Sequence, residues 1–277
     1  MFSITLLANP KQNPLTTQEV DSAARDLKAQ DVCWLEAGIA CRLIVENYSS
    51  SVIRHLSSDI IIQPHPRPRY KLFVADMEST IIENECLDEL ADYVGLRDKI
   101  EAITRRAMNG ELDFEQALKE RVGLLAGLPE SALQEVYDER VRLMPGAEAL
   151  MKALKDAGIY TMLVSGGFSF YTQRIKARLR FDEERSNKLE IAAGKLTGRV
   201  IPPILDKNAK LAALNEGCAK LGIFPAEAIA IGDGANDLPM LLAAGLGVAY
   251  HAKPNVRAQA KNQLNHCDLS ALIYAIS

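Results

Sequence analysis

The sequence KLFVADMESTIIENEC (residues 71–86) decides the fold, because an unbroken apolar run stops there at a carboxylate. The run Leu72–Ala75 lacks polar alternation, which is typical of a strand buried on both faces of a parallel sheet. Such sheets carry their chemistry just beyond the carboxyl ends of their strands. Asp76 therefore lies where a catalytic group is expected, with Glu78 beside it. A simpler interpretation, in which Asp76 only caps the following helix, fits this segment equally well.

The composition indicates a globular protein of roughly two domains, with 277 residues of which 48% are hydrophobic. A formal net charge of -4 provides no basic field, so nucleic acid is not an expected partner. No apolar stretch approaches the length needed to cross a bilayer, and we expect no membrane insertion. The five cysteines are widely spaced and form no CxxC pair, which favours a reducing cytoplasm over a disulfide framework or a zinc site.

Residues 1–66 predict a small α+β domain, ferredoxin-like or ACT-like. The expected elements are a strand over 2–8, a helix over 16–29, two short strands within 32–46, a helix over 51–57 and a strand over 60–63. The following sequence PHPRPR (64–69) interrupts regular structure, since proline lacks an N–H donor and restrains the residue before it. We predict the domain boundary there, with a second domain over 67–277.

Three segments in succession have apolar residues at helical spacing: 83–109, 113–123 and 130–142. They precede the next strand-like run, so they break the simple alternation of strand and helix. We therefore predict an inserted helical cap over about 84–142, above the strand ends. The alternative is an ordinary helical layer on the sheet.

Regular alternation of helix and strand from residue 145 onward predicts an α/β fold with a doubly wound parallel sheet. Helices are expected over 147–157, 170–179, 210–221 and 238–244, and strands over 160–164, 228–231 and 246–250. We also expect a glycine turn at Ser165-Gly166-Gly167 and a β-hairpin within 189–204.

Polar groups follow three of the predicted strands: Asp76 with Glu78, Ser165 with Gly166, and Asp233 with Asn236 and Asp237. The carboxyl ends of parallel strands share one edge of the sheet, so these groups should meet. Two carboxylates from separate strands suit magnesium, while a serine, glycine amides and a lysine, Lys210, suit phosphate oxygens. Asp76 would then attack phosphorus and form an aspartyl phosphate. Each motif alone also fits a turn, a tight loop or a solvated lysine, but their joint order favours phosphoryl transfer.

These motifs resemble the haloacid dehalogenase superfamily, whose pattern is DxDxT after a strand, a serine or threonine after a second strand, a lysine, and GDxxxD. Here they are DMEST, VSGG, Lys210 and GDGAND. From residue 71 to about 275 the chain resembles the phosphoserine phosphatase family, through ADMESTIIENECLDELA, FEQALKERVGLLAGLP and IAIGDGANDLPMLLAAGLGVAYHAKP. The resemblance implies hydrolysis of O-phospho-L-serine to L-serine and phosphate, the last step of serine biosynthesis, in the cytoplasm.

The resemblance also implies a role for each site residue. Asp76 would be the nucleophile and Glu78 the acid/base. Mg²⁺ would bind Asp76, the backbone carbonyl of Glu78 and Asp233, with Asp237 supporting the ion. Glu85 would bind the substrate ammonium and Arg121 the substrate carboxylate, and the phosphate would be held by Ser165, Gly166, Lys210 and Asn236. From the residues alone, Arg121 fits a surface helix residue paired with Glu115 or Glu120, and Lys207 competes with Lys210.

One residue departs from the superfamily pattern, because its second aspartate is Glu78 here. Glutamate has the same chemistry and a similar pKa, but its longer side chain must be repositioned. Two other functions remain open: a phosphatase or phosphotransferase for another small phosphomonoester, and an amino-acid sensor or assembly module with a weakened phosphatase core. The sequence is compatible with a homodimer and does not give the oligomeric state.

Overall fold

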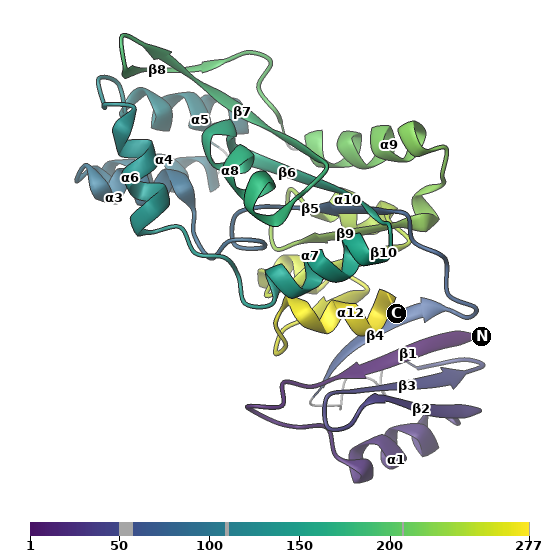
Figure 1. Ribbon diagram of the computed structural model, residues 1–277. Helices are drawn as coiled ribbons and strands as arrows, with labels where there is room; N and C mark the ends of the chain where they lie inside the picture. Colours follow the sequence, from purple (N-terminus) through teal and green to yellow (C-terminus); the bar gives the residue numbers. More distant parts are fainter. Residues whose placement is uncertain (50–57, 109–110, 207, 277) are drawn as a thin grey trace.

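The computed structural model describes residues 1–49, 58–108, 111–206 and 208–276, so the helix predicted over 51–57 and Lys207 lie outside the described residues. Within them a single sheet has the strand order β2-β3-β1-β4-β11-β10-β9-β5-β6-β7-β8 (Figure 1). The strands are β1 (Phe2–Leu7), β2 (Asp31–Glu36), β3 (Ala40–Val45), β4 (Asp59–Pro64), β5 (Leu72–Ala75), β6 (Tyr160–Phe168), β7 (Glu183–Ala192), β8 (Lys195–Ile201), β9 (Ala228–Gly232), β10 (Leu246–Tyr250) and β11 (Asn262–Leu264). The α-helices are α1 (Thr17–Asp26), α3 (Cys86–Tyr93), α4 (Arg97–Met108), α5 (Phe114–Gly123), α6 (Ser131–Glu139), α7 (Ala147–Asp156), α8 (Ser169–Leu179), α9 (Ala209–Leu221), α10 (Leu238–Ala243), α11 (Pro254–Arg257) and α12 (Ile273–Ile276), and the short 3₁₀ helices are η1 (Pro225–Glu227) and η2 (Leu269–Leu272).

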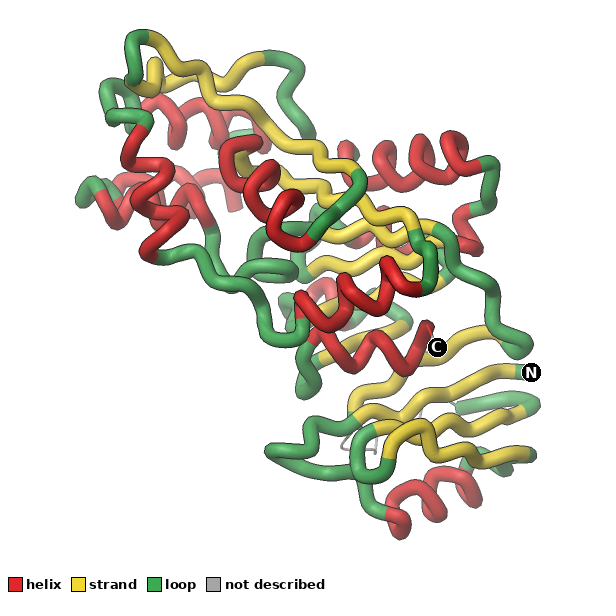
Figure 2. The backbone as a smooth tube through the Cα atoms, viewed as in Figure 1, coloured by secondary structure: helices red, strands yellow, loops and turns green. Residues whose placement is uncertain are grey.

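Strand β5 lies at the centre of the parallel part of the sheet and is buried on both faces. Leu72 and Val74 pack on the face covered by α9 and α10, while Phe73 and Ala75 pack on the face covered by α7 and α8. Figure 2 shows these helices on both sides of the strands. The predicted α/β fold with a doubly wound, mostly parallel sheet is confirmed.

The strand order places three chain segments at one edge of the sheet. β5 is parallel to both of its neighbours, and Ala75 pairs with Ile231 of β9 and with Leu163 of β6. After β5 the chain first forms β6 and β7 on one side of it and later β9 and β10 on the other side, which makes the carboxyl end of β5 the switch point where ligands bind in such folds. Residues that follow Ala75, Leu163 and Ile231 therefore face a common crevice.

Strand β6 corrects one prediction. Ser165 and the two glycines after it were expected to form a turn, but β6 continues through them to Phe168. The register of its pairing with β7 shifts between Val164 and Phe168. The two glycines lie within this irregular part of the strand, where residues without side chains are well tolerated. The side chain of Asn187 from β7 donates to the carbonyl of Gly166 at 2.8 Å and holds the extended conformation.

The N-terminal strands join the same sheet. Strands β1, β3 and β4 are antiparallel, and α1 begins with a capping box of Thr16 and Glu19. β4 then pairs with β11, where Gln263 opposes Ile60, and the side chain of Asn262 accepts from the backbone N–H of Ile62 at 2.7 Å. The sheet therefore continues across the predicted boundary at 64–69, and the division into 1–66 and 67–277 stays a prediction.

Helices α3 to α6 lie beyond the carboxyl end of the sheet (Figure 1). The expected helical segment 83–109 is interrupted, because the chain turns at Gly95, whose φ is +69°. Two linkers connect these helices to the sheet and pair with each other. The N–H of Glu83 donates to Arg142 and the N–H of Met144 donates to Ile81, each at 2.9 Å.

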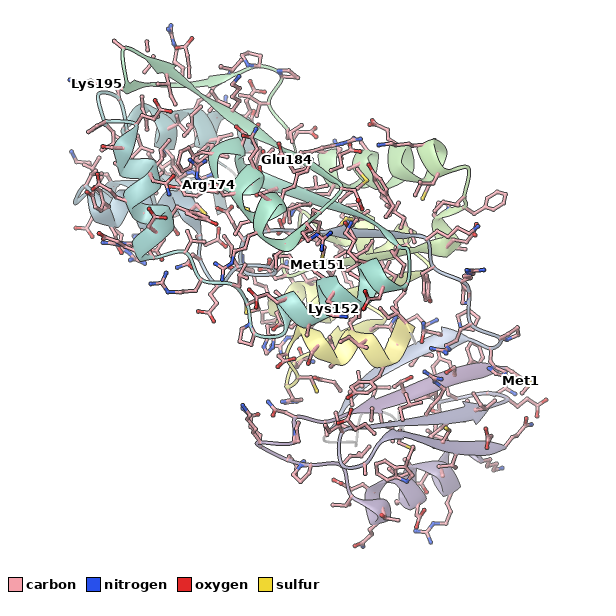
Figure 3. The ribbon with its side chains drawn as sticks, viewed as in Figure 1. Met1, Met151, Lys152, Arg174, Glu184 and Lys195 are labelled. Carbon is pink, nitrogen blue, oxygen red and sulfur yellow. The ribbon has the colours of Figure 1, made fainter. Side chains whose placement is uncertain are left out.

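The cap helices also contact the sheet domain on the side of the β7–β8 hairpin. Gly127 and Leu196 are joined by a backbone hydrogen bond of 2.8 Å where the loop before α6 meets β8. Arg174, labelled in Figure 3, points from α8 toward the cap and donates to Gln134 of α6 at 3.0 and 2.8 Å. The cap is thus held above the strand ends by its linkers, the hairpin and α8.

Candidate active site

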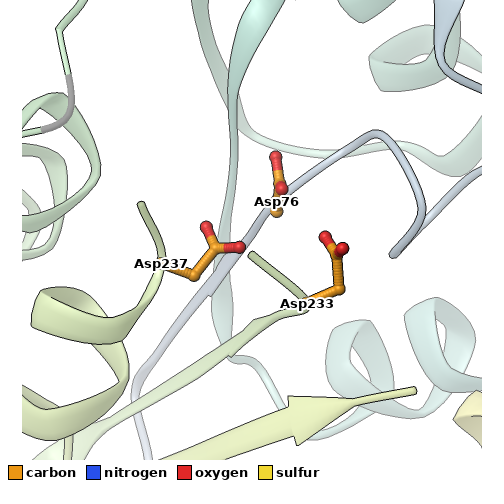
Figure 4. Close-up of side chains that lie close together, drawn as sticks. All are labelled: Asp76, Asp233 and Asp237. Atoms are coloured by element: carbon orange, nitrogen blue, oxygen red, sulfur yellow. The ribbon is translucent and has the colours of Figure 1, made fainter. Parts of the chain in front are cut away.

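Three buried carboxylates meet at the switch point. Asp76 follows β5, Asp233 follows β9, and Asp237 precedes α10; one oxygen of each lies within 4.8 Å of the others (Figure 4). Asp237 can approach this closely because Gly232 has no side chain: a Cβ there would lie 2.3 Å from the Asp237 carboxyl carbon. The Gly234 N–H donates to Asp237 at 2.8 Å and fixes its orientation.

Lys210 is the buried cation of this cluster, while the exposed Lys253 lies 4.0 Å from Asp233. The Nζ of Lys210 lies 2.7 Å from an oxygen of Asp76 and 2.5 Å from an oxygen of Asp237, and the residue is only 4% exposed. The interpretation of Lys210 as a solvated helix residue is therefore wrong. Burial favours the neutral amine, but Asp76 and Asp237 together raise the pKa of Lys210, so the side chain is charged.

One buried ammonium, with the exposed Lys253 at 4.0 Å from Asp233, does not neutralise three buried carboxylates. Burial, followed by repulsion from Asp237, raises the pKa of Asp76 despite its contact with Lys210. The same two causes raise the pKa of Asp233 to about 6. Crowded, buried carboxylate oxygens of this kind fit a divalent cation that prefers oxygen ligands, so the chemistry of the donor set is compatible with a metal site.

A small pocket beside the carboxylates holds the groups predicted to bind phosphate. Ser165, Gly166, Lys210 and Asn236 all line it, together with Phe114 of the cap helix α5. The hydroxyl of Ser165 accepts from the Gly167 N–H at 2.9 Å, which leaves its proton free to donate into the pocket. The structure thus brings together the predicted strand-end groups and Lys210.

The carboxylate of Glu78 lies at the start of α3. Its Oε1 accepts from the Cys86 N–H at 2.8 Å. Burial and the nearby Glu85 raise the pKa of Glu78 to about 7, although the Cys86 N–H opposes this shift. A carboxyl group with this pKa can both give and take a proton near neutral pH.

Glu85 and Arg121 lie near Glu78 on two cap helices. Glu85 immediately precedes α3, is exposed, and accepts from the Ser79 hydroxyl at 2.7 Å. Arg121, in the last turn of α5, is partly buried; burial lowers the pKa of Arg121, while Asp88, Glu78 and Glu85 oppose the shift. Its guanidinium makes no ion pair with the residues that the structure describes.

The surface interpretation of Arg121 is wrong. Its two suggested partners are taken by other cations, since Glu115 pairs with Lys119 at 2.6 Å and Glu120 pairs with Arg106 at 2.7 Å. Arg121 is therefore available to a ligand that enters between the cap and the strand ends.

Comparison with known proteins agrees with this geometry. Residues 73–242 match the sequence profile of haloacid dehalogenase-like hydrolases. The chain belongs to this hydrolase family. It is 50% identical over 209 residues to a phosphoserine phosphatase of Polaromonas sp. strain JS666, which covers 74% of this chain and 89% of that protein.

Solved structures resemble the hydrolase over different lengths. A haloacid dehalogenase family hydrolase from Salmonella enterica serovar Typhi has a TM-score of 0.87 and 34% identity, and the match covers 100% of this chain and 99% of that one. A phospho-aspartyl intermediate analogue of a phosphoserine phosphatase has a TM-score of 0.69 and 37% identity, covering 76% of this chain and all of that one. The N-terminal strands are therefore shared with the first structure. No helix in the described part of the hydrolase is long and apolar enough to cross a membrane.

Sequence reasoning missed three supporting residues of the hydrolase site. The Asn187 side chain donates to the Gly166 carbonyl, and the Cys86 N–H donates to the Glu78 carboxylate. Gly232 leaves room for the Asp237 carboxylate because it has no side chain. No sequence pattern marked Asn187 as a site residue, because it lies in a segment of ordinary strand composition. A pattern did mark Gly232, since a glycine directly before a strand-end aspartate indicates a close approach.

Proposed function

We propose that this hydrolase converts O-phospho-L-serine to L-serine and phosphate through an aspartyl phosphate on Asp76. The observation that carries the proposal is the position of Asp76: it is buried at the switch point, one oxygen accepts from the Met77 N–H at 2.7 Å and the other contacts Lys210. The phosphate pocket of Ser165 and Asn236 lies next to it. The similarity to a phosphoserine phosphatase supports the substrate.

In the first step, an Asp76 oxygen attacks phosphorus and forms a new P–O bond, while the bond from phosphorus to the serine oxygen breaks. Glu78 in its protonated form donates a proton to the leaving oxygen. Lys210, the Ser165 hydroxyl and the Asn236 amide offset the negative charge of the transferred group. L-Serine then leaves the site.

In the second step, Glu78 removes a proton from a water molecule as the water attacks phosphorus. The bond between phosphorus and Asp76 breaks, and phosphate is released. The pKa of Glu78, raised to about 7, suits both proton transfers, because neither form of the carboxyl group is strongly disfavoured.

We propose Mg²⁺ as the cation of the carboxylate cluster, held by Asp76, Asp233 and the backbone carbonyl of Glu78. When bound, it supplies positive charge near the transferred phosphoryl group. Asp237 contacts Lys210 and accepts from Gly234, so we assign it a supporting role. The small, hard oxygen donors support magnesium over a softer metal.

Two residues of the cap are proposed to select the substrate. A phosphoserine carries an ammonium and a carboxylate besides its phosphate. We assign the ammonium to Glu85 and the carboxylate to Arg121, because the Arg121 guanidinium has a bidentate donor geometry and no ion-pair partner among the described residues.

Phosphate release tests the proposal. Phosphoserine, phosphoethanolamine, glycerol phosphate and a sugar phosphate should be compared with and without Mg²⁺, and phosphoserine should give the highest kcat/KM. Asp76→Asn should release no phosphate, while Asp156→Asn on the exposed side of α7 should behave like the wild type. Equal rates for all four esters would replace phosphoserine with a broader substrate class, and turnover by Asp76→Asn would overturn the mechanism.

We also propose that the hydrolase works in the cytoplasm and forms a homodimer. All five cysteines are free thiols, which supports a reducing compartment. Size-exclusion chromatography with light scattering tests the dimer.

A further inference from the structure

The β7–β8 hairpin lies along the cap helix α5 (Figure 1). Its tip pairs with the loop between α5 and α6 through backbone hydrogen bonds of 2.8 to 2.9 Å: the N–H of Gly127 donates to Leu196, that of Leu196 to Leu128, and that of Glu130 to Gly194. The cap is therefore joined to the hairpin at a place well separated in sequence from its two linkers. None of these residues belongs to the proposed active site.

Strand β8 contains a β-bulge at Gly198. Leu189 pairs with Val200 and Ile191 pairs with Leu196, so the one residue of β7 between these pairs faces three residues of β8. Gly198, the middle one of the three, has a φ of +81°, a left-handed conformation that glycine adopts without strain. Bulges of this kind bend a strand and are frequent next to active sites.

At Gly198 the backbone of β8 lies directly against the end of α5. A Cβ at this position would lie 2.9 Å from the Cβ of Ala126 and 3.3 Å from the carbonyl oxygen of Gly123. The shorter distance is one that Cβ atoms essentially never show, so a side chain at Gly198 would force the two segments apart. Gly123 is the last residue of α5, and Arg121 precedes it by two positions. The surface of β8 therefore determines where the last turn of α5 lies, and with it Arg121.

Helix α5 reaches from the phosphate pocket to the residue proposed to bind the substrate carboxylate. Its first residue, Phe114, lines the phosphate pocket, and a Cβ on Gly166 would be 3.4 Å from the Phe114 ring. In the last turn, the Nε of Arg121 donates to the carbonyl of Ala117 at 3.2 Å, which directs the side chain back along the helix. The position of α5 thus sets the distance between the phosphate-binding groups and the Arg121 guanidinium.

The hairpin is braced by its own side chains. The carboxylate of Glu190 accepts from the Thr197 hydroxyl at 2.6 Å and from the Nε of Arg199 at 2.7 Å, across the bulge. Leu196 is buried in the same hydrophobic cluster as Leu125, which follows α5. Because the strand is held on both sides, it can support the end of a helix in one position.

We propose that the β7–β8 hairpin, through Gly198, positions Arg121 for the carboxylate of the substrate, so that Gly198 is a positioning residue for substrate selection. The proposal rests on the carboxylate-binding role of Arg121 in the proposed function. A displaced end of α5 moves the guanidinium relative to the phosphate pocket, and a bidentate contact with a carboxylate weakens because it depends on alignment. A substrate without a carboxylate does not use that contact.

Steady-state kinetics of Gly198→Ala test the proposal. KM for phosphoserine should rise about five-fold or more, while KM for phosphoethanolamine, which lacks the carboxylate, should change less than about two-fold. Gly194→Ala is the matched control, because Gly194 lies in the turn of the same hairpin with a φ of +72°, but a Cβ there has no neighbour within 4 Å among the described residues. It adds similar backbone strain without the contact and should leave both KM values unchanged. Equal rises for the two substrates, or an equal effect of Gly194→Ala, overturn the proposal.

Three further variants connect the effect to Arg121 and to the contact with Ala126. In an Arg121→Ala background, Gly198→Ala should raise KM for phosphoserine no further, because the positioned group is gone. Ala126→Gly in the Gly198→Ala background removes the atom nearest to the added methyl group and should recover part of the loss. Ala126→Val, at an exposed position, enlarges the same contact from the cap side and should separate the two substrates in the same way. A further rise in the first variant, or no recovery in the second, shows that Gly198 acts by a route other than Arg121.

Amide hydrogen exchange tests the contact without reference to the substrate. The amide of Gly127, which donates to Leu196, should exchange faster in Gly198→Ala than in the wild type and in Gly194→Ala, because the loop after α5 is displaced from the hairpin. Unchanged exchange overturns the role of the hairpin, whatever ester the enzyme hydrolyses. Faster exchange in a chain whose Arg121→Ala variant keeps the wild-type KM overturns the assignment of Arg121 in the proposed function, and leaves the hairpin contact established.

Discussion

The carboxylate of Glu78 lies directly against the α-carbon of Gly167. A Cβ built on Gly167 would be 3.0 Å from both oxygens of Glu78, which is tighter than nine in ten Cβ contacts in proteins. On its other side the carboxylate accepts from the Cys86 N–H. The longer side chain that distinguishes this chain from the superfamily pattern is therefore accommodated by the absence of a side chain at Gly167.

Gly167→Ala should lower kcat by about two- to ten-fold, because the added methyl group forces the Glu78 carboxylate to shift by a few tenths of an ångström, and a displacement of about 1 Å in a catalytic group costs about a hundred-fold in rate. The backbone at Gly167 is not in the left-handed region, so alanine introduces no backbone strain, and the loss should come from the displaced carboxylate. Steady-state phosphate release from phosphoserine measures it.

Two further variants make the explanation specific. Glu78→Asp in the Gly167→Ala background shortens the acid and should recover part of the lost rate. Gly123→Ala adds a methyl group with no neighbour within 4 Å and should leave kcat unchanged. If Gly167→Ala had wild-type kcat, Glu78 would not be positioned by this contact.

The strand ends were predictable from sequence because local patterns determine them. The run before Asp76 is buried on both faces, and the glycine-aspartate pair at 232–233 follows a second such run, β9. The contact between Glu78 and Gly167 was not predictable, because it joins the loop after β5 to β6 and lies where the pairing of β6 with β7 shifts in register. Local sequence patterns indicate whether a segment forms a strand or a helix, whereas tertiary packing determines which side chains are in contact.

The continuity of the sheet was also beyond sequence reasoning. The proline-rich segment 64–69 indicates a boundary, but the pairing of β4 with β11 joins residues about 200 positions apart. Asp59 provides the strongest such link, since its carboxylate accepts from the backbone N–H groups of Asn265, His266 and Cys267 at 2.8 to 2.9 Å. No local pattern marks Asp59 as the partner of that loop.

Lys210→Met should abolish turnover and also destabilise the fold. Its removal leaves Asp76 and Asp237 buried together without their cation, and the loss of one member of a buried ion pair typically costs about 3–5 kcal/mol. Denaturant unfolding without added metal measures this cost. Lys220→Met, on the same helix but exposed, should cost far less stability, because water screens its ion pair with Glu183. Equal effects of the two substitutions would contradict the burial of Lys210.

Asp233→Asn should have opposite effects on stability with and without Mg²⁺. Without the ion, it removes one of three crowded carboxylates and should raise the melting temperature, because repulsion and burial disfavour that charge. Added Mg²⁺ should raise the melting temperature of the wild type by binding to the folded state, but not that of the variant. A variant that gains as much from Mg²⁺ as the wild type would remove Asp233 from the proposed metal site.

Arg121→Ala should raise KM for phosphoserine by about ten-fold or more and spare phosphoethanolamine, which lacks the carboxylate. Arg106→Ala is the matched control, since this exposed arginine pairs with Glu120 rather than with substrate. Equal losses on both substrates would indicate that Arg121 supports the cap or the phosphate instead.

Glu78→Gln separates the two steps of the proposed reaction. Glutamine keeps the size of the side chain and the backbone carbonyl proposed for the metal, but it cannot take a proton from water. Hydrolysis of the aspartyl phosphate should therefore slow more than its formation, and phosphorylated Asp76 should accumulate and be detected by intact mass spectrometry followed by peptide mapping. Glu85→Gln, which changes the neighbouring acid, should raise KM without trapping the intermediate.

The pH dependence gives an independent measurement. Because the pKa of Glu78 is raised to about 7, the base form that activates water is lost as the pH decreases, and wild-type kcat should fall as the pH drops through about 7. This decrease should be absent in Glu78→Gln, whose side chain does not titrate. A Glu78→Gln variant that turns over phosphoserine at the wild-type rate from about pH 5 to about pH 8 would show that water manages the protons without Glu78.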